Sequence, residues 1–573
     1  KVNGVVQNPT IAGNTLTFAG PASVAGNATV TVEYVLLANA NIGGGEYSNK
    51  VKATLDGITT PEIEDKVTVV DLSKTASPTT IFAGNTVTYT VSAKNNGQVA
   101  VNSLKLIDSP DLTNFTYKLG SAKVNGATIA DPVNAGNNLT FTAGTNVLPG
   151  TTLTLTYEMI SKANIPVGTY PNKVHGELTV GSKTSSTGEK EVTVKVAKNG
   201  VTKEADNKYI IAGDEVTYTV KVQNTTGSTV TNTKIVDTPD LTKFTYKTGS
   251  GRVNGITQNP VIAGNTMTFT GPNPFADGST ATVVYTLVAN ANIAGGEYSN
   301  KVKATLDGIT TPEVEDKVTI VDLTKKANPT TIFAGNTVTY TVTTKNTGQV
   351  AVNSLKLVDK PDLVNFTYKT GSAKVNGVSI ADPVNAGGNL TFTAGTNVAP
   401  GTTLTLTYEM ISKINIPVGS YVNKVHGELT VGNKTDTTGE REAAVKVATN
   451  GVTKEANMKY IIAGDEVTYT VTVENTTGSA VANTKIIDTA DLTKFTYKVG
   501  SGRVNGTTQN PAFSGNTMTF TGPASVANGG VVTATYTLIA NMNIAGGEYS
   551  NKVIADLDGI TTREVEEKVA VVK

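Results

Sequence analysis

Short runs in which apolar and polar residues alternate follow one another along the whole chain. Thr86–Val91 reads TVTYTV and Thr152–Tyr157 reads TLTLTY, and turn residues such as Asn95–Gly97 and Pro149–Gly150 separate runs of this kind. Alternation with a period of two predicts strands that bury one face, and no window shows a helical period. Roughly seven to nine short strands in about 120 residues are typical of an immunoglobulin-like β-sandwich.

The same series of strands recurs along the chain in two alternating forms. The twelve residues TIFAGNTVTYTV occur at Thr80–Val91 and again at Thr331–Val342, which is 251 positions later. A chain that repeats one module is usually built for length, valency or reach rather than around one active site. The tag Val-Asn-Gly, whose copies are separated alternately by 122 and 129 residues, begins at Val2, Val124, Val253, Val375 and Val504.

We therefore expect an all-β protein of tandem immunoglobulin-like β-sandwich domains arranged as an extended rod, because the units join with almost no linker. Lys1–Gly4 matches the middle of a unit, so residues 1–69 are expected to be the C-terminal half of a B-type sandwich. Half a sandwich cannot bury its own core, which implies a longer parent chain or a partner that supplies the missing strands. The complete units are expected to be A-type sandwiches at 70–198 and 321–449, and B-type sandwiches at 199–320 and 450–573.

Composition narrows the possible functions. The 573 residues include no Cys, which excludes disulfides and thiol chemistry. The 47 Lys and Arg residues balance the 47 Asp and Glu residues. The chain therefore lacks the net positive charge by which a nucleic-acid-binding protein attracts its ligand over a long range. No apolar run approaches the roughly 20 residues of a membrane helix. We expect no nucleic-acid partner, no membrane insertion in this segment, and no metal or cofactor, with His175 and His426 as ordinary surface strand residues.

Three polar residues recur at a fixed spacing in every complete unit. In the first unit they are Lys74, Asp108 and Asn172, so that the Asp follows the Lys by 34 residues and the Asn follows it by 98. Residues two positions apart on a strand share a face, and the neighbours at that spacing are mostly apolar, so all three side chains are expected in the core. The other members are Lys203, Asp237 and Asn300; Lys325, Asp359 and Asn423; Lys454, Asp488 and Asn551; and Asn49 alone in the partial unit.

Burying these groups without partners is costly, and two interpretations remove the cost. The first is a buried Lys–Asp ion pair to which the Asn is hydrogen-bonded. The second is an intramolecular isopeptide bond. Burial lowers the pKa of a Lys and raises the pKa of an Asp, so a neutral amine can attack the Asn carboxamide carbon. The protonated Asp then polarises the carbonyl and relays the proton, ammonia leaves, and the Asp has a catalytic role in this autocatalytic step only. We favour the isopeptide bond.

Two resemblances follow from these motifs. The series Ala83–Val91, Pro149–Tyr157 and Gly168–Val174 resembles the domain-of-unknown-function-eleven repeat of bacterial and archaeal cell-surface proteins. That resemblance implies an extracellular, wall-attached or fibrous protein without enzymatic activity. A Lys on an early strand, an Asp in mid-unit and an Asn on a late strand resemble the isopeptide-crosslinked immunoglobulin-like domains of Gram-positive pilins and adhesins.

The first hypothesis for function is therefore an extracellular structural stalk or fibre on a cell surface or in a cell-wall-attached filament. Its partners are other copies of the chain or neighbouring repeats. The alternative is an adhesin that binds a host or matrix ligand through repeat faces or a missing tip domain. Near-identical copies favour the stalk, because a dedicated binding unit is expected to diverge from its neighbours. An enzyme is the third hypothesis, and the absence of a Ser/His/Asp or metal-ligand cluster from the sequence disfavours it.

Overall fold

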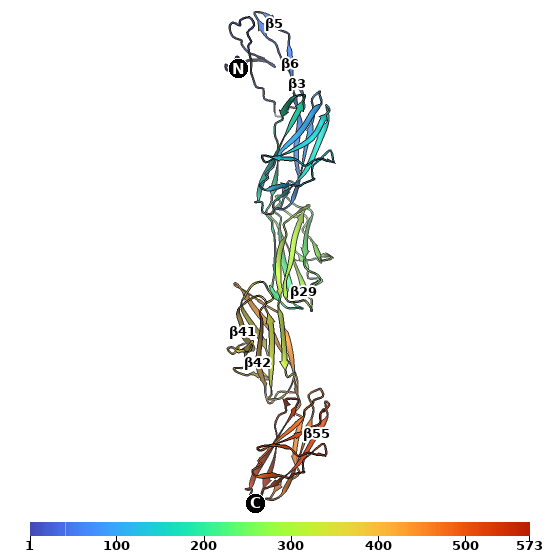
Figure 1. The fold of residues 1–573 in the computed structure, drawn as a ribbon, viewed down its shortest axis with the longest axis vertical. Coiled ribbons are helices and arrows are strands. Elements are labelled where there is room, and N and C mark those ends of the chain that lie inside the picture. Colours follow the sequence, from blue (N-terminus) through green and yellow to red (C-terminus); the bar gives the residue numbers. More distant parts are fainter. Residues whose placement is uncertain (40–41) are drawn as a thin grey trace. The chain divides into compact units, whose positions relative to one another are not determined.

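The computed structural model describes residues 1–39 and 42–573, and all regular secondary structure within these ranges is β-strand (Figure 1). The expected all-β class is thereby confirmed. The chain divides into two compact units, one made mainly of residues 1–199 and the other mainly of residues 200–573. Within the described ranges, no helix exists that is long and apolar enough to cross a membrane.

Residues 1–69 form three small two-stranded sheets. Of the apolar residues described in this segment, Val2 alone is buried, whereas Val35 and Leu37 are 92% and 94% exposed. The segment therefore buries no core of its own. Its strands are β1 (Thr10–Ala12), β2 (Thr15–Thr17), β3 (Gly45–Val51), β4 (Thr54–Leu55), β5 (Ile58–Thr59) and β6 (Ile63–Val69).

Two sheets that share one core are built from the strands that lie within residues 70–198, the range expected for the first A-type unit. The seven-stranded sheet runs β14-β15-β10-β17-β19-β8 with β18 paired to β17, and the six-stranded sheet runs β13-β12-β16-β9-β7 with β11 paired to β16. Alternate residues of each strand point inward, so Tyr89 and Val91 from one sheet join Leu104 and Leu106 from the other. The strands are β7 (Asp71–Ser77), β8 (Thr80–Ile81), β9 (Thr86–Lys94), β10 (Val101–Ser109), β11 (Phe115–Tyr117), β12 (Lys123–Val124), β13 (Ala127–Thr128), β14 (Val133–Ala135), β15 (Asn138–Val147), β16 (Thr152–Ser161), β17 (Gly168–Val180), β18 (Lys183–Ser186) and β19 (Lys190–Val196).

This sandwich contains more strands than the seven to nine that the sequence predicts. The long strands lie where the alternation places them, and the predicted closing strand is β19. The additional strands are short segments of two to four residues, namely β8, β11, β12, β13, β14 and β18. A run this short carries too little alternation to be recognised.

The repeated Val-Asn-Gly tag is a two-residue hairpin turn. Asn125 and Gly126 have φ angles of 50° and 83° and join β12 to β13. Positive φ at both central positions is the requirement of a type I′ turn, and Asn-Gly is its preferred pair. The tag therefore specifies a tight turn in the fold.

Residues 200–573 contain three further sandwiches, each with a six-stranded and a seven-stranded sheet in the same order as above. The B-type sandwich at 199–320 contains β20 (Val201–Ala205), β21 (Tyr209–Ile210), β22 (Glu215–Gln223), β23 (Thr233–Thr238), β24 (Phe244–Tyr246), β25 (Arg252–Val253), β26 (Ile256–Thr257), β27 (Val261–Ala263), β28 (Thr266–Thr270), β29 (Thr280–Ala289), β30 (Gly296–Leu306), β31 (Ile309–Thr310) and β32 (Val314–Ile320).

The two remaining sandwiches repeat the A-type and B-type patterns. The A-type one contains β33 (Asp322–Asn328), β34 (Thr331–Phe333), β35 (Thr337–Lys345), β36 (Val352–Lys360), β37 (Phe366–Tyr368), β38 (Lys374–Val375), β39 (Val378–Ser379), β40 (Val384–Ala386), β41 (Asn389–Val398), β42 (Thr403–Ser412), β43 (Gly419–Val431), β44 (Lys434–Thr437) and β45 (Arg441–Ala448). The B-type one contains β46 (Val452–Ala456), β47 (Tyr460–Ile461), β48 (Glu466–Glu474), β49 (Lys485–Ala490), β50 (Phe495–Tyr497), β51 (Arg503–Val504), β52 (Thr507–Thr508), β53 (Ala512–Ser514), β54 (Thr517–Thr521), β55 (Val531–Ala540), β56 (Gly547–Leu557), β57 (Ile560–Thr561) and β58 (Val565–Val571).

Candidate functional site

A cluster of buried polar side chains lies between the two sheets of each complete sandwich. At 70–198, Lys74 is on β7, the edge strand of the six-stranded sheet, whereas Asp108 is on β10 and Asn172 on β17, neighbours in the seven-stranded sheet. Asp108 faces Val174 across the β10–β17 ladder, so Asn172 is two residues along the same inward face. Lys74 and Asn172 therefore belong to different sheets and face each other across the core.

The structure brings the predicted Lys, Asp and Asn together in all four sandwiches. Lys74 Nζ forms an ion pair with Asp108, and their side chains are 0% and 1% exposed. The corresponding pairs at Lys203, Lys325 and Lys454 are equally buried. Asn172 is 2% exposed and Asn423 is 3% exposed. The sequence therefore identifies the positions of the buried groups, while the presence of a covalent bond remains a prediction.

Sequence reasoning missed a fourth member of the cluster, a tyrosine on β16, the central strand of the six-stranded sheet. Lys74 Nζ donates to the Tyr157 hydroxyl at 3.1 Å, and Asn172 Nδ2 donates to the same oxygen at 3.3 Å. The equivalent residues are Tyr285, Tyr408 and Tyr536. A signal was available, because this tyrosine follows the Lys by 82 or 83 residues in every unit. In the sequence, however, this tyrosine cannot be distinguished from other core aromatic residues, because it occupies an inward position of an alternating strand.

A second tyrosine packs against the first and also lies close to the lysine amine. Tyr89 stacks on Tyr157 with ring centroids 5.4 Å apart, and Lys74 Nζ lies 5.0 Å from the Tyr89 centroid. The same stacked pair occurs in the other three sandwiches. The aromatic faces exclude water from the amine and replace part of its lost hydration.

The A-type and B-type clusters differ in how the carboxamide is held. In the A-type sandwiches the Asn Nδ2 also donates to the Asp carboxylate, at 3.1 Å for Asn172 and 3.0 Å for Asn423. In the B-type sandwiches Nδ2 donates to the tyrosine at 2.8 Å, and one oxygen of Asp237 and of Asp488 is buried without a hydrogen-bond partner. The Asn carboxamide oxygen is buried without a partner in all four.

That orphaned oxygen bears on the expected role of the aspartate. The sequence-based mechanism has the Asp polarise the carbonyl, but here the carboxamide nitrogen faces the A-type carboxylates. An unsatisfied buried acceptor costs about 1–3 kcal/mol, so the unreacted carboxamide is held in an unfavourable environment. If the Asn carboxamide rotates by half a turn, its oxygen faces the Asp. A hydrogen bond from the protonated Asp to this oxygen then removes that cost.

Burial dominates the electrostatics of the cluster. It lowers the pKa of Lys74, Lys203 and Lys325, against the opposing attraction of the partner carboxylate, and it lowers the pKa of Lys454 to about 8. Burial likewise raises the pKa of Asp108, Asp237 and Asp488, again against the paired lysine. Both directions favour transfer of a proton from the ammonium to the carboxylate, which leaves a neutral amine beside the carboxamide.

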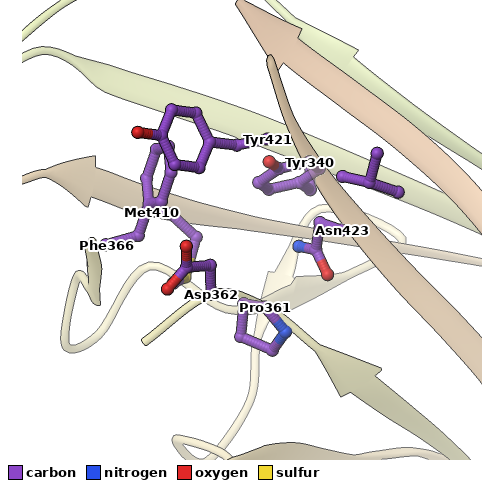
Figure 2. Close-up of a pocket in the computed structure, with 8 residues that line it drawn as sticks. Tyr340, Pro361, Asp362, Phe366, Met410, Tyr421 and Asn423 are labelled. Atoms are coloured by element: carbon purple, nitrogen blue, oxygen red, sulfur yellow. The ribbon is translucent and has the colours of Figure 1, made fainter. Parts of the chain in front are cut away.

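A small cavity adjoins the carboxamide in the A-type sandwich at 321–449. Its volume is about 10 Å³, close to the space that one water molecule occupies. Figure 2 shows Asn423 at this cavity, with Tyr340, Asp362 and Pro361 around it. The cavity can therefore receive one small polar molecule next to the reacting group.

The partial unit contains only one of the expected groups. Asn49 lies on β3 and donates to the Tyr34 hydroxyl at 2.7 Å, but both residues are exposed. This Asn–Tyr contact matches the Asn172–Tyr157 contact of the complete units. Among the residues described at 1–69, no Lys or Asp is hydrogen-bonded to Asn49, so no crosslink is assigned there. No group of three or more His, Cys, Asp and Glu side chains in the described ranges is arranged to hold a metal ion.

The lowered pKa of Lys454 gives a prediction for the chain carrying Asn551→Ala, in which the lysine cannot be crosslinked. The folded-state pKa of about 8 lies below the ordinary 10.5, so between these values the unfolded state binds more protons. The stability of the last sandwich is therefore expected to rise from near pH 8 to near pH 10.5. Pulse proteolysis in urea measures it, with Lys454→Met/Asn551→Ala as the control. A midpoint difference between the two chains that is flat or falls with pH contradicts the prediction.

Comparison with known proteins gives matches among solved structures only. No family model matches the chain and no curated protein matches it, so the resemblance to the domain-of-unknown-function-eleven repeat gains no support. The C-terminal domain of the Streptococcus pyogenes antigen I/II-family protein AspA is 13% identical, with 43% of this chain and 99% of that one covered and a TM-score of 0.22.

Two further matches are described as an adhesin and as a membrane anchored protein. The collagen adhesin CNA from S. aureus is 15% identical over 44% of this chain and 92% of that one, with a TM-score of 0.18. A putative membrane anchored protein from Corynebacterium diphtheriae is 13% identical over 71% of this chain and 97% of that one, also with a TM-score of 0.18. These scores are too low to transfer a ligand or an activity to this chain.

Proposed function

We propose that this chain is a non-enzymatic structural repeat protein of an extracellular stalk or fibre, with one Lys–Asn isopeptide bond in each complete sandwich. The single observation that carries the proposal is the repeated cluster, in which an amine, a carboxyl group and a carboxamide are buried together in the core four times. A buried ion pair alone is weak support for stability, because desolvation offsets its attraction. A neutral amide in the same place avoids that penalty.

The reaction requires only the groups present in the cluster. The lysine ammonium gives one proton to the aspartate, and the neutral Nζ attacks the Asn carboxamide carbon Cγ. The bond from Cγ to Nδ2 then breaks, and ammonia leaves. Lysine and asparagine end as a secondary amide, and the aspartic acid beside it can donate to the amide oxygen. No oxidant, cofactor or external nucleophile is needed to balance the atoms.

The arrangement fits a load-bearing role on a cell surface or in a cell-wall-attached filament. The proposed bond ties β7, the first strand of a sandwich, to β17, a strand close to its end. A force applied at one end of the unit is then carried to the other end of the unit through a covalent bond. Other copies of the chain or neighbouring repeats are the proposed partners, and a host or matrix ligand is the second candidate.

The test is the intact mass of the full chain produced from its gene. We expect a mass lower than the sequence mass by four molecules of ammonia, one for each buried cluster. Tandem mass spectrometry of a digest is expected to locate the bonds, of which the first joins Lys74 to Asn172. An unmodified mass shows that the clusters are ion pairs. The chain is then a plain repeat protein, for which adhesion is the better hypothesis.

A further inference from the structure

One hydroxyl lies within hydrogen-bond distance of both nitrogens that change partners in the proposed reaction. In the B-type sandwich at 199–320, the Tyr285 oxygen is 2.6 Å from Lys203 Nζ and 2.8 Å from Asn300 Nδ2. In the A-type sandwich at 321–449, the Tyr408 oxygen is 2.7 Å from Nζ and 3.1 Å from Nδ2. The hydroxyl therefore bridges the amine that attacks and the amide nitrogen that leaves.

The aspartate does not offer the same bridge everywhere. Asp359 contacts both Lys325 Nζ and Asn423 Nδ2. Asp237 contacts Lys203, but its other oxygen is buried without a partner, and Asn300 Nδ2 donates to the tyrosine. Among the residues described in the B-type sandwiches, the tyrosine is thus the group that hydrogen-bonds to both nitrogens.

We propose that this tyrosine is a further catalytic residue, which carries a proton from the attacking lysine nitrogen to the leaving amide nitrogen; this role rests on the crosslinking proposed above. When Nζ bonds to Cγ it must lose a second proton, and Nδ2 must gain one to leave as ammonia. The phenol oxygen accepts the Nζ proton while its own proton passes to Nδ2. The tyrosine ends unchanged, and no other acid or base is consumed.

The raised pKa of the buried tyrosine favours a transfer in which both protons move together. Burial raises the pKa of Tyr157, Tyr285, Tyr408 and Tyr536 well above the usual value, so a free phenolate does not form. A hydroxyl that accepts one proton while it donates another never carries a charge. In addition, the cavity of about 10 Å³ beside Asn423 has room for the departing ammonia.

The test compares tyrosine variants of the full chain made by cell-free synthesis and sampled over time, with each crosslink quantified by digestion and mass spectrometry. Tyr285→Phe is expected to slow the Lys203–Asn300 bond by about 100-fold, a typical contribution of general acid–base catalysis. Tyr408→Phe is expected to slow the Lys325–Asn423 bond less, because Asp359 also reaches both nitrogens. The matched control is Tyr368→Phe, which removes a hydroxyl in the same sandwich that donates to Asp382, outside the buried cluster.

The outcomes separate the relay from the crosslinking itself. A wild-type chain without crosslinks overturns the proposed function. A wild-type chain with crosslinks and a Tyr285→Phe chain that reacts at the same rate overturn the relay alone. Hydrogen exchange on β22 and β29 shows whether Tyr285→Phe is folded, and exchange on β35 and β42 shows it for the variants of the sandwich at 321–449. Should Tyr285→Phe not fold, the wild-type chain is measured in heavy water, where slower crosslinking is expected and an unchanged rate overturns the relay.

Discussion

The Asp108→Ala chain is expected to lose the crosslink of the sandwich at 70–198 and to keep the other three. Without the carboxylate, Lys74 has no acceptor for its first proton, and the buried amine lacks its charged partner. Closing a loop of about 100 residues restricts the unfolded chain by about 4.7 kcal/mol if the disulfide estimate applies. The sandwich is expected to fold without that contribution and to melt well below its three neighbours. Intact mass and calorimetry of the same sample measure both effects.

Asn172→Ala is the control that separates the crosslink from the ion pair. It also prevents the bond, but it leaves the contact between Lys74 and Asp108 in place. Removing one partner of a buried pair costs roughly 3–5 kcal/mol, so Asp108→Ala is expected to be the more destabilising change. Recovery of the Lys74–Asn172 bond in Asp108→Ala removes the aspartate from the mechanism. Equal melting of the two variants shows that the ion pair contributes little.

The sequence was sufficient to locate the buried triads but not the full cluster. Alternation fixes which side chains share a face, so a Lys two positions from Leu72 and Ala76 was predictable as a core residue. The role of Tyr157 was not, because an inward tyrosine on a strand is common and only the three-dimensional meeting of β7, β16 and β17 shows what its hydroxyl contacts.

The difference between A-type and B-type clusters could not be predicted from the sequence pattern either. Both types carry the same residues, and the Asn follows the tyrosine by 15 positions in each. The Lys-to-Tyr spacing is one residue shorter in the B type, which was visible but had no structural meaning without the sheets. The short hairpin strands were not predicted for a related reason, because the residues of the turn and not the alternation determine where they form.

Single-molecule stretching is expected to show the largest consequence of the crosslinks. In a sandwich without the bond, unfolding releases the whole unit of about 120 residues, or about 400 Å of chain. A bond between Lys74 and Asn172 encloses 98 residues, which keeps about 330 Å of that length unavailable to force. The wild-type chain is therefore expected to show no full-length unfolding steps from its four complete sandwiches.

The matched comparison is a chain in which the four asparagines are replaced by alanine, with the buried ion pairs retained. This chain is expected to give one full-length step for each complete sandwich, because no covalent bond between the early Lys strand and the late Asn strand then resists the load. Single replacements restore one step at a time and assign each step to its sandwich. Full-length steps in the wild-type chain would contradict the crosslinks, because a closed loop between Lys74 and Asn172 cannot extend under load. The buried clusters would then be ion pairs, and resistance to tension would depend on noncovalent contacts alone.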